Sequence, residues 1–243
     1  MIIISAGIPK SGTAWYFNLT NDLLVAAGAQ DAREIQLRYH LQSILLGRNC
    51  LFHARSIQKF RILVPSLLGN TFAIKVHGSP GKFNRLILRA RMARSTLIYR
   101  DPRDIAVSLF DHAERLRQKG KYNHPFAEVD SIDAAIWMAK EWLLDWDAWK
   151  MQDGTLMTHY EDLVNDPVQE MLRLRDYLHL DVPATVINDL AEKHQPGSDS
   201  RMKKRYHFNR GKVGRYKTVF TAEQDALCRE CFSGTLERMG YQW

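Results

Sequence analysis

Runs of branched apolar residues alternate with segments in which apolar residues recur at helical spacing. Four runs predict buried strands: IIISAG (2–7), TFAIKVH (71–77), STLIYR (95–100) and TLMTHY (155–160). Apolar residues from Trp15 to Ala27 predict a helix over about 12–27. Further helices are expected over 103–118, 131–150, 167–179, 183–194 and 221–239. This alternation predicts an α/β fold class, with a central parallel sheet flanked by helices and right-handed crossovers.

The length and composition of the chain predict a single domain over residues 1–243. A chain of 243 residues, 45% hydrophobic and 25% charged, suits one packed globular domain and leaves little room for a second. The stretch 194–217, HQPGSDSRMKKRYHFNRGKVGRYK, is rich in Lys, Arg, Gly and Ser and lacks a hydrophobic period. We expect it to be a basic loop.

Polar side chains follow each of the four predicted strands. Lys10 to Thr13 follow the first, Lys75 and His77 end the second, residues 100–104 leave the third, and residues 160–162 end the fourth. Ligands of parallel sheets bind beyond the carboxyl ends of the strands. The four groups therefore predict one site along that edge.

The turn IPKSGTAW has the composition of an anion cradle at a helix N-terminus. Lys10 supplies a cation, Ser11 and Thr13 supply hydroxyls, and Gly12 lets the backbone approach a ligand closely. It is not a Walker loop, because Lys10 precedes the glycine and no strand ending in a magnesium-binding Asp accompanies it. An ordinary strand-to-helix turn with a surface lysine is the alternative.

Two further segments carry chemistry. In YRDPRDIAVSLFDH, Arg100 and Ser108 lie eight residues apart, so a guanidinium and a hydroxyl can converge on one oxyanion. In KVH, strand alternation puts Lys75 and His77 on one face, and the histidine can serve as a general base. Solvated charges at a helix start and a structural histidine are the alternatives.

The net charge of +7 fits nucleic acid, an anionic membrane or a phosphorylated small molecule as partner. Three cysteines, Cys50, Cys228 and Cys231, are too few for a disulfide framework, and the last two lie in a helical pattern that favours packing over a metal site. No signal peptide or membrane-spanning run is apparent. We therefore predict a cytoplasmic protein with no membrane or nucleic-acid partner, and we make no prediction of its oligomeric state.

Together these segments resemble the sulfotransferases that use 3′-phosphoadenosine 5′-phosphosulfate (PAPS). PKSGTAW resembles the 5′-phosphosulfate loop of that family, RDPRDIAVS its 3′-phosphate segment, and KVH the stretch that carries the catalytic base. YEDL (160–163) is similar to the segment near adenine, and FNRGKVGRYKTVFT (208–221) to the C-terminal motif. These matches follow the family order from residue 9 to residue 221.

The resemblance implies a P-loop-nucleotide-kinase-like architecture and sulfuryl transfer from PAPS, without a metal, to a hydroxyl or amine of a small-molecule acceptor. It implies these catalytic residues: His77, Lys10 and Lys75. It implies these cofactor-binding residues: Lys10, Ser11, Gly12, Thr13, Ala14, Trp15, Arg100, Ser108, Tyr160, Asn209, Arg210 and Gly211. Three positions depart from the family pattern, namely Asn209, which removes a cation, Ala14, which removes a hydroxyl, and Tyr216, which replaces Trp. Lys212 or Arg215 could replace the missing cation.

The acceptor stays open at this level. A saccharide or peptide acceptor is the alternative within the family, and a nucleotide kinase or phosphotransferase is a more remote one. A nucleic-acid-binding protein and a catalytically silent relative also fit parts of the pattern. Candidates to line the acceptor pocket are Tyr39, His40, His53, Phe83, His112, Tyr122, His124 and Trp137.

Overall fold

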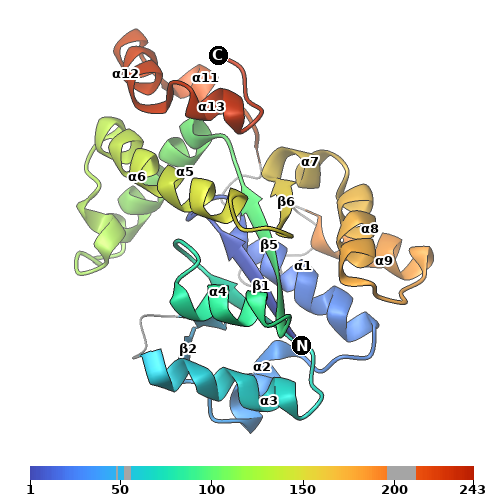
Figure 1. Ribbon diagram of the computed structural model, residues 1–243. Helices are drawn as coiled ribbons and strands as arrows, with labels where there is room; N and C mark the ends of the chain where they lie inside the picture. The colour runs from blue at the N-terminus through green and yellow to red at the C-terminus, as the bar shows by residue number, and fades with distance from the viewer. Residues whose placement is uncertain (48, 52–55, 196–211) are drawn as a thin grey trace.

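A six-stranded sheet forms the centre of the computed structural model, which describes residues 1–47, 49–51, 56–195 and 212–243. Its order is β2-β3-β4-β1-β5-β6, with bounds β1 Ile2–Gly7, β2 Leu45–Leu46, β3 Cys50–Leu51, β4 Phe72–Val76, β5 Ala93–Tyr99 and β6 Leu156–His159. β2 pairs antiparallel with β3, and every other pairing is parallel. The chain is therefore a single α/β domain with a mostly parallel sheet (Figure 1).

Helices cover the sheet on both faces (Figure 1). The longer ones are α1 Thr13–Ala26, α2 Ala32–Arg38, α4 Lys82–Arg89, α5 Pro102–Gln118, α6 Ile132–Lys150, α8 Pro167–Leu178, α9 Ala184–His194 and α12 Ala222–Phe232. The shorter ones are α3 Leu63–Leu67, α7 Tyr160–Asn165, α11 Tyr216–Val219, α13 Thr235–Arg238 and the 3₁₀ helices η1 Ser56–Ile62 and η2 Pro125–Glu128. None of the helices in the described segments is long and apolar enough to cross a membrane.

Strand β1 lies between β4 and β5 and fixes the edge at which the site forms. Its register pairs Ile2 with Phe72 and Gly7 with Ile98, and all six of its residues are buried. A strand buried on both faces explains why the sequence shows a continuous apolar run instead of alternation. The carboxyl ends of β4, β1, β5 and β6 consequently lie along one edge of the sheet.

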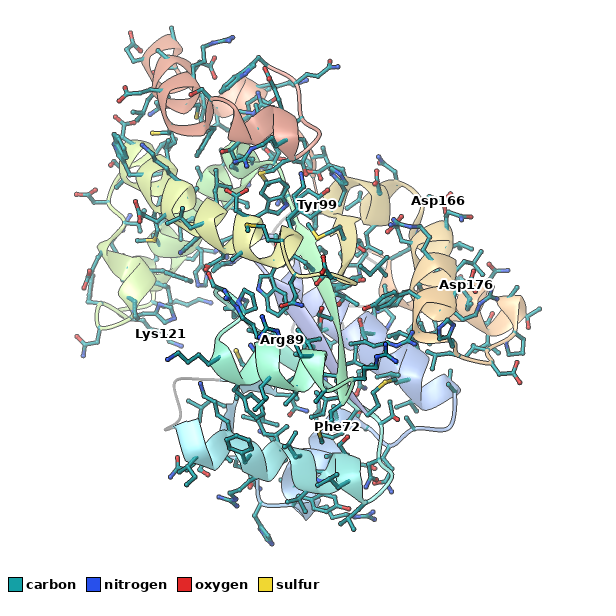
Figure 2. The ribbon with its side chains drawn as sticks, in the orientation of Figure 1. Phe72, Arg89, Tyr99, Lys121, Asp166 and Asp176 are labelled. Carbon is teal, nitrogen blue, oxygen red and sulfur yellow. The ribbon has the colours of Figure 1, made fainter. Side chains whose placement is uncertain are left out.

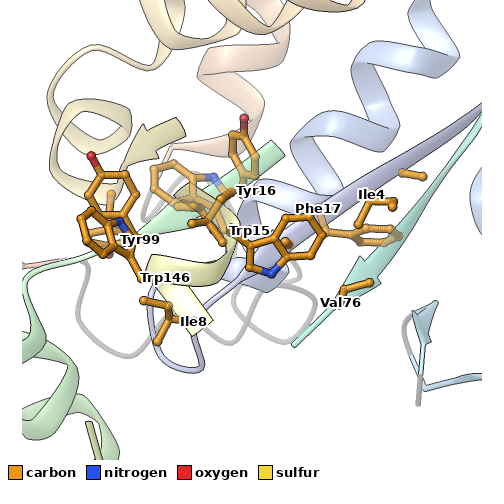
Figure 3. Packing of buried hydrophobic residues seen from close by; sticks show 14 of the residues in the cluster. Ile4, Ile8, Trp15, Tyr16, Phe17, Val76, Tyr99 and Trp146 are labelled. Atoms are coloured by element: carbon orange, nitrogen blue, oxygen red, sulfur yellow. The ribbon is translucent and has the colours of Figure 1, made fainter. Parts of the chain in front are cut away.

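The core fills the space between the sheet and its helices. Figure 3 shows Trp15, Tyr16 and Phe17 of α1 in one buried cluster with the sheet residues Ile4 and Val76. On the other part of the cluster, the rings of Tyr99 and Trp146 lie 5.9 Å apart between centroids. Cys228 and Cys231 are buried in α12, which confirms their packing role.

Most of the predicted elements are confirmed, with shifts of one or two residues at their ends. The structure adds β2, β3, α2, α3 and α4. The sequence did not reveal them because each has only two to eight residues, too few for a clear hydrophobic period. The single helix expected over 221–239 is two helices, since Gly234 between them has a φ of 73° that no helix interior adopts. Tyr160 begins α7 instead of ending a strand. Residues 196–211 of the expected basic loop lie outside the described residues.

Candidate functional site

The loop between β1 and α1 presents free backbone donors at a helix N-terminus. Lys10 has a φ of 71° and Gly12 a φ of 85°, so the chain turns sharply through the left-handed region. Within the described part of the chain, the amides of Gly12, Thr13 and Ala14 have no hydrogen-bond partner. Three amides at the positive end of the α1 dipole form a cradle for an anion.

The hydroxyls of this loop are turned toward the protein. Ser11 Oγ lies 2.6 Å from the carbonyl oxygen of Ile8 and 3.1 Å from that of Ile98, and Thr13 Oγ1 donates to Ile8 at 3.1 Å. The sequence predicts that both hydroxyls contact a phosphate. In the structure both hydroxyls bond the main chain and hold the loop against β1 and β5, so the amides are its available donors.

Two glycines are required by close packing in this loop. A Cβ atom on Gly12 would lie 2.7 Å from the Tyr160 ring, and one on Gly7 would lie 2.5 Å from Thr13 Oγ1. Tyr160 also contacts the Trp15 ring edge to face, with centroids 5.9 Å apart. Gly7 was not predicted as a required residue, because the requirement comes from a contact with Thr13 across the turn.

The pKa of Lys10 is lowered from its ordinary value. Burial lowers its pKa to about 8, with a further lowering by Arg115 and Arg100, while Asp111 opposes the shift. The ammonium group is therefore largely removed from water, near two guanidinium groups and one carboxylate. Such a region favours an anionic ligand, which would restore the charged form of the lysine.

His77 is oriented as a proton acceptor. Its Nδ1 lies 2.9 Å from the carbonyl oxygen of Gly7, so Nδ1 carries the proton and Nε2 is left with its lone pair. Burial, and next the charge of Lys75, lower the pKa of His77 to about 4, against the hydrogen bond to Gly7. The imidazole is still exposed on one side, which moderates the effect of burial. At neutral pH the ring is uncharged and can accept a proton.

The loop that follows His77 is fixed by α6. Trp149 Nε1 donates to the carbonyl oxygen of Gly78 at 2.8 Å, and Ser79 Oγ donates to Asp145 at 2.5 Å. Lys75 is half-buried, and its amide donates to Asn49 of the neighbouring segment at 2.8 Å. The strand end that carries the candidate base is therefore held from two sides.

Arg100 lies in a buried polar cluster at the end of β5. Its Nη2 donates to Asp104 at 2.9 Å and to the Lys212 carbonyl at 2.6 Å, and its guanidinium lies 4.3 Å from the Tyr160 ring centroid. Its Nε is buried without a hydrogen-bond partner among the described residues. Ser108 is also buried, and no described residue bonds its hydroxyl. These two groups are the remaining donors for an anion here.

Asp104 organises the C-terminal motif against α5. Its carboxylate accepts hydrogen bonds from the amides of Gly214 at 2.8 Å and Tyr216 at 3.2 Å, in addition to the pair with Arg100. The sequence placed Asp104 in the polar group that follows the third strand, with a solvated helix-start charge as the alternative, and gave no sign of Gly214 and Tyr216, which lie more than a hundred residues away. Of the two candidate replacement cations, Arg215 pairs with Asp111 at 2.8 Å, and Lys212 bonds Arg100 through its main chain. Asn209, Arg210 and Gly211 lie outside the described residues.

A network of side-chain hydrogen bonds lies beside this cluster, and the sequence did not predict it. Tyr241 donates to Glu161 at 2.6 Å, His159 Nδ1 lies 3.3 Å from the Tyr241 oxygen, and Tyr99 bonds His159 Nε2 at 2.6 Å. Glu161 also accepts from the Asp101 amide at 3.4 Å. Burial raises the pKa of both Tyr241 and Glu161. This hydrogen-bond network connects Tyr241 to the starts of α5 and α7.

The residues predicted to line an acceptor pocket fall into separate places. Tyr39 bonds Asn70 near the start of β4, the opposite end of that strand from His77. His40 follows Tyr39 directly, and its carbonyl oxygen accepts a hydrogen bond from Arg61 at 2.9 Å. The Phe83 ring contacts Phe60 at 5.5 Å, His112 and His124 contact each other at 5.8 Å, and Tyr122 and Trp137 are exposed. His53 lies outside the described residues.

Comparison with known proteins gives a family and a set of similar folds. The sulfotransferase domain family matches residues 2–240. The mouse sulfotransferase SULT7A1, solved with PAP, is 16% identical, with a TM-score of 0.63 over 96% of this chain and 85% of that one. A retinol dehydratase solved with androsterone and PAP is 18% identical, with a TM-score of 0.60 over 100% of this chain and 82% of that one. The same enzyme with retinol and PAP gives a TM-score of 0.60 at 18% identity, over 100% of this chain and 83% of that one. No curated protein matches the sequence.

Proposed function

The chain belongs to the sulfotransferase family, and from that premise we propose that it transfers a sulfuryl group from PAPS to a hydroxyl or amine of a small-molecule acceptor. The observation that carries the proposal is two sets of hydrogen-bond donors along one sheet edge, which have no acceptor among the described residues. One is the set of amides at Gly12, Thr13 and Ala14, and the other is Arg100 Nε with the Ser108 hydroxyl. Two donor groups match a ligand with two separate phosphate positions.

These residues fit the cofactor by their chemistry. The loop amides and Lys10 would hold the 5′-phosphosulfate, and Arg100 with Ser108 would hold the 3′-phosphate. Trp15 and Tyr160 would pack against adenine, as the family resemblance implies. PAPS supplies the activated sulfuryl group and, after transfer, leaves as adenosine 3′,5′-bisphosphate (PAP). We assign no metal to the reaction, because fixed backbone and side-chain donors meet the phosphate charge.

The protein's own residues perform the proton and charge steps. His77 would accept the acceptor's proton at Nε2, while the Gly7 carbonyl keeps Nδ1 protonated and the ring oriented. Lys10 would stabilise negative charge that develops toward the 5′-phosphate, and Lys75 would add a second positive charge beside His77. Because these groups sit on the ends of β1 and β4, the sheet fixes their relative positions.

One of the similar folds was solved with small molecules beside PAP. The retinol dehydratase was solved with retinol and with androsterone, which supports a small acceptor here. We also propose a cytoplasmic location, which the three free cysteines support, since thiols persist in reducing compartments.

Calorimetry with PAP tests the cofactor assignment, and a screen of alcohols, phenols and amines with PAPS tests transfer. We expect PAP to bind the wild type and to bind Ser108→Ala more weakly, with a control variant at exposed Lys121 unchanged. Mass spectrometry should show the gain of one SO₃ group on an acceptor. Absence of PAP binding at millimolar concentration would overturn the proposal. Transfer found only to saccharides or peptides would overturn the acceptor assignment alone.

A further inference from the structure

One continuous segment of the chain contains basic residues and no acidic ones. Residues 35–100 contain twelve Lys or Arg and no Asp or Glu. The rest of the chain has 22 Lys and Arg against 27 Asp and Glu, so the net charge of +7 comes entirely from this segment. The proposed reaction uses two of these cations, namely Lys75 beside His77 and Arg100 at the 3′-phosphate. The others have no role in the proposed reaction.

The same segment exposes large apolar side chains. Ile57, Phe60, Val64, Leu67 and Leu68 of the η1–α3 region are 79%, 45%, 46%, 71% and 67% exposed, respectively. Ile57, Phe60, Val64 and Leu67 recur every three or four residues, as on one side of a helix, and Leu68 adjoins them. A soluble surface rarely exposes so many large apolar residues together without a binding partner.

Helix α4 continues this surface. The ring of Phe83 at its start contacts Phe60 of η1 with centroids 5.5 Å apart, and Figure 1 shows α3 and α4 in the same part of the molecule. The outward side of α4 carries Leu86, which is 51% exposed, between the exposed cations Lys82, Arg85 and Arg89. Figure 2 labels Arg89 at the end of this helix. In the part of the chain that the structure describes, none of these three cations pairs with an acid.

A cleft extends the basic surface beyond α4. It has a volume of about 1,030 Å³, and its charged lining consists of Arg85, Arg89, Arg91, Arg94 and a single carboxylate from Asp153. His179 is also at its wall. Guanidinium groups form bidentate contacts with phosphate oxygens, so this cleft can receive phosphate-bearing headgroups.

We propose that this docking face, made of the exposed apolar residues of 57–68 and Leu86 together with Lys59, Lys82, Arg85 and Arg89, binds the surface of an anionic lipid membrane. The apolar side chains would enter the interface, and the cations would contact the headgroup phosphates. Nucleic acid would pair with the cations and leave the apolar row in water. A folded protein partner would be matched by interspersed charges of both signs, whereas a segment without a single acid matches a diffuse anionic surface.

This binding is peripheral and needs no spanning segment. The sequence predicted no membrane partner, since no run is long enough to cross a bilayer, although its net charge also fitted an anionic membrane. Helix α4 begins five residues after His77, so the docking face adjoins the loop that carries the proposed base. The inference rests on the surface alone and stands independently of the reaction.

Co-sedimentation with lipid vesicles tests the proposal on the full chain. We expect binding to vesicles of phosphatidylcholine mixed with phosphatidylserine, weak binding to phosphatidylcholine alone, and a loss of binding at high salt. Lys82→Gln with Arg89→Gln should weaken binding roughly 30-fold, since each cation near an anionic surface is worth roughly fivefold. Leu67→Ser with Leu68→Ser should weaken it by roughly tenfold or more.

Matched controls show whether binding depends on the docking face or only on the total charge and apolar surface of the protein. Lys119→Gln with Lys121→Gln removes two exposed cations elsewhere, and Leu144→Ser removes an apolar side chain that is 66% exposed on α6. Both controls should bind vesicles as the wild type does, and circular dichroism with urea unfolding should confirm that every variant is folded. No binding to anionic vesicles would overturn the proposal. Binding that the serine variants retain in full, with tighter binding to RNA, would overturn it in favour of a nucleic-acid surface.

Discussion

Gly12 offers a sharp test of how the cofactor loop is built. Gly12→Ala would place a methyl group 2.7 Å from the Tyr160 ring at a φ of 85°. Gly28→Ala is the matched control, because Gly28 has a φ of 88° but open space around its Cβ position. Gly28 also follows the far end of α1, about 20 Å along the helix from the loop. The two variants share the backbone strain and differ only in the contact.

The magnitudes follow from these two contributions. A left-handed alanine costs about 1–2 kcal/mol, partly offset by about 0.4–1 kcal/mol from the lower entropy of the unfolded chain. Gly28→Ala should therefore lower the free energy of unfolding by about 1 kcal/mol. Overpacking against Tyr160 adds about 1–3 kcal/mol, so Gly12→Ala should lower it by about 2–4 kcal/mol. Each kcal/mol lowers the melting temperature by about 2–4 °C in a chain of this size.

Urea unfolding of both variants measures the difference, and calorimetry with PAP measures the site. Tyr160 is buried between Gly12, Trp15 and Arg100, so displacing its ring should weaken PAP binding in Gly12→Ala and leave Gly28→Ala unchanged. Equal stability losses in the two variants would show that the approach of Tyr160 to Gly12 carries no energy. Full PAP affinity in a destabilised Gly12→Ala would show that Tyr160 does not shape the cofactor site.

Three further predictions concern the site. His77→Ala should lower turnover by ~10²-fold or more while PAP affinity stays at the wild-type value, and unchanged turnover would remove His77 as the base. Because the pKa of Lys10 is lowered to about 8, this lysine loses its charge as the pH rises from 7 to 9, so calorimetry should show PAP binding weakening by roughly tenfold per pH unit above 8. Lys10→Arg should bind PAP with a flat profile over that range, and a wild-type profile that is equally flat would contradict the assignment. Asp104→Asn should weaken PAP binding although it removes a negative charge from an anion site, because it frees Arg100 and the amides of Gly214 and Tyr216. Tighter binding by that variant would show that Asp104 acts only by repulsion.

The sequence predicted the elements whose residues carry the signal locally. The apolar run 2–7 becomes β1, and the Asp101–Pro102 pair starts α5 with a side-chain cap to the Arg103 amide. β2 and β3 have two residues each, so no period can mark them. Their existence depends on pairing with neighbours, which is a tertiary property.

The candidate site divides in the same way. His77, Lys10 and Arg100 were predicted as site residues because each lies at or after the end of a strand that the sequence reveals. The inward orientation of the Ser11 hydroxyl depends on the carbonyl of Ile98, 87 residues away, and local sequence contains no sign of it. The hydrogen bond from Tyr241 to Glu161 likewise joins residues 80 positions apart.

The hydrogen bond between His77 and Gly7 has a mechanical consequence. Gly7 is the last residue of β1, and the cradle of amides begins only a few residues later, so the imidazole is fastened to the strand that also carries the anion loop. When thermal motion shifts that strand end, base and loop shift together. The distance between the proposed base and the anion loop therefore depends mainly on the short backbone stretch from Ile8 to Gly12, and less on how far β4 moves relative to β1.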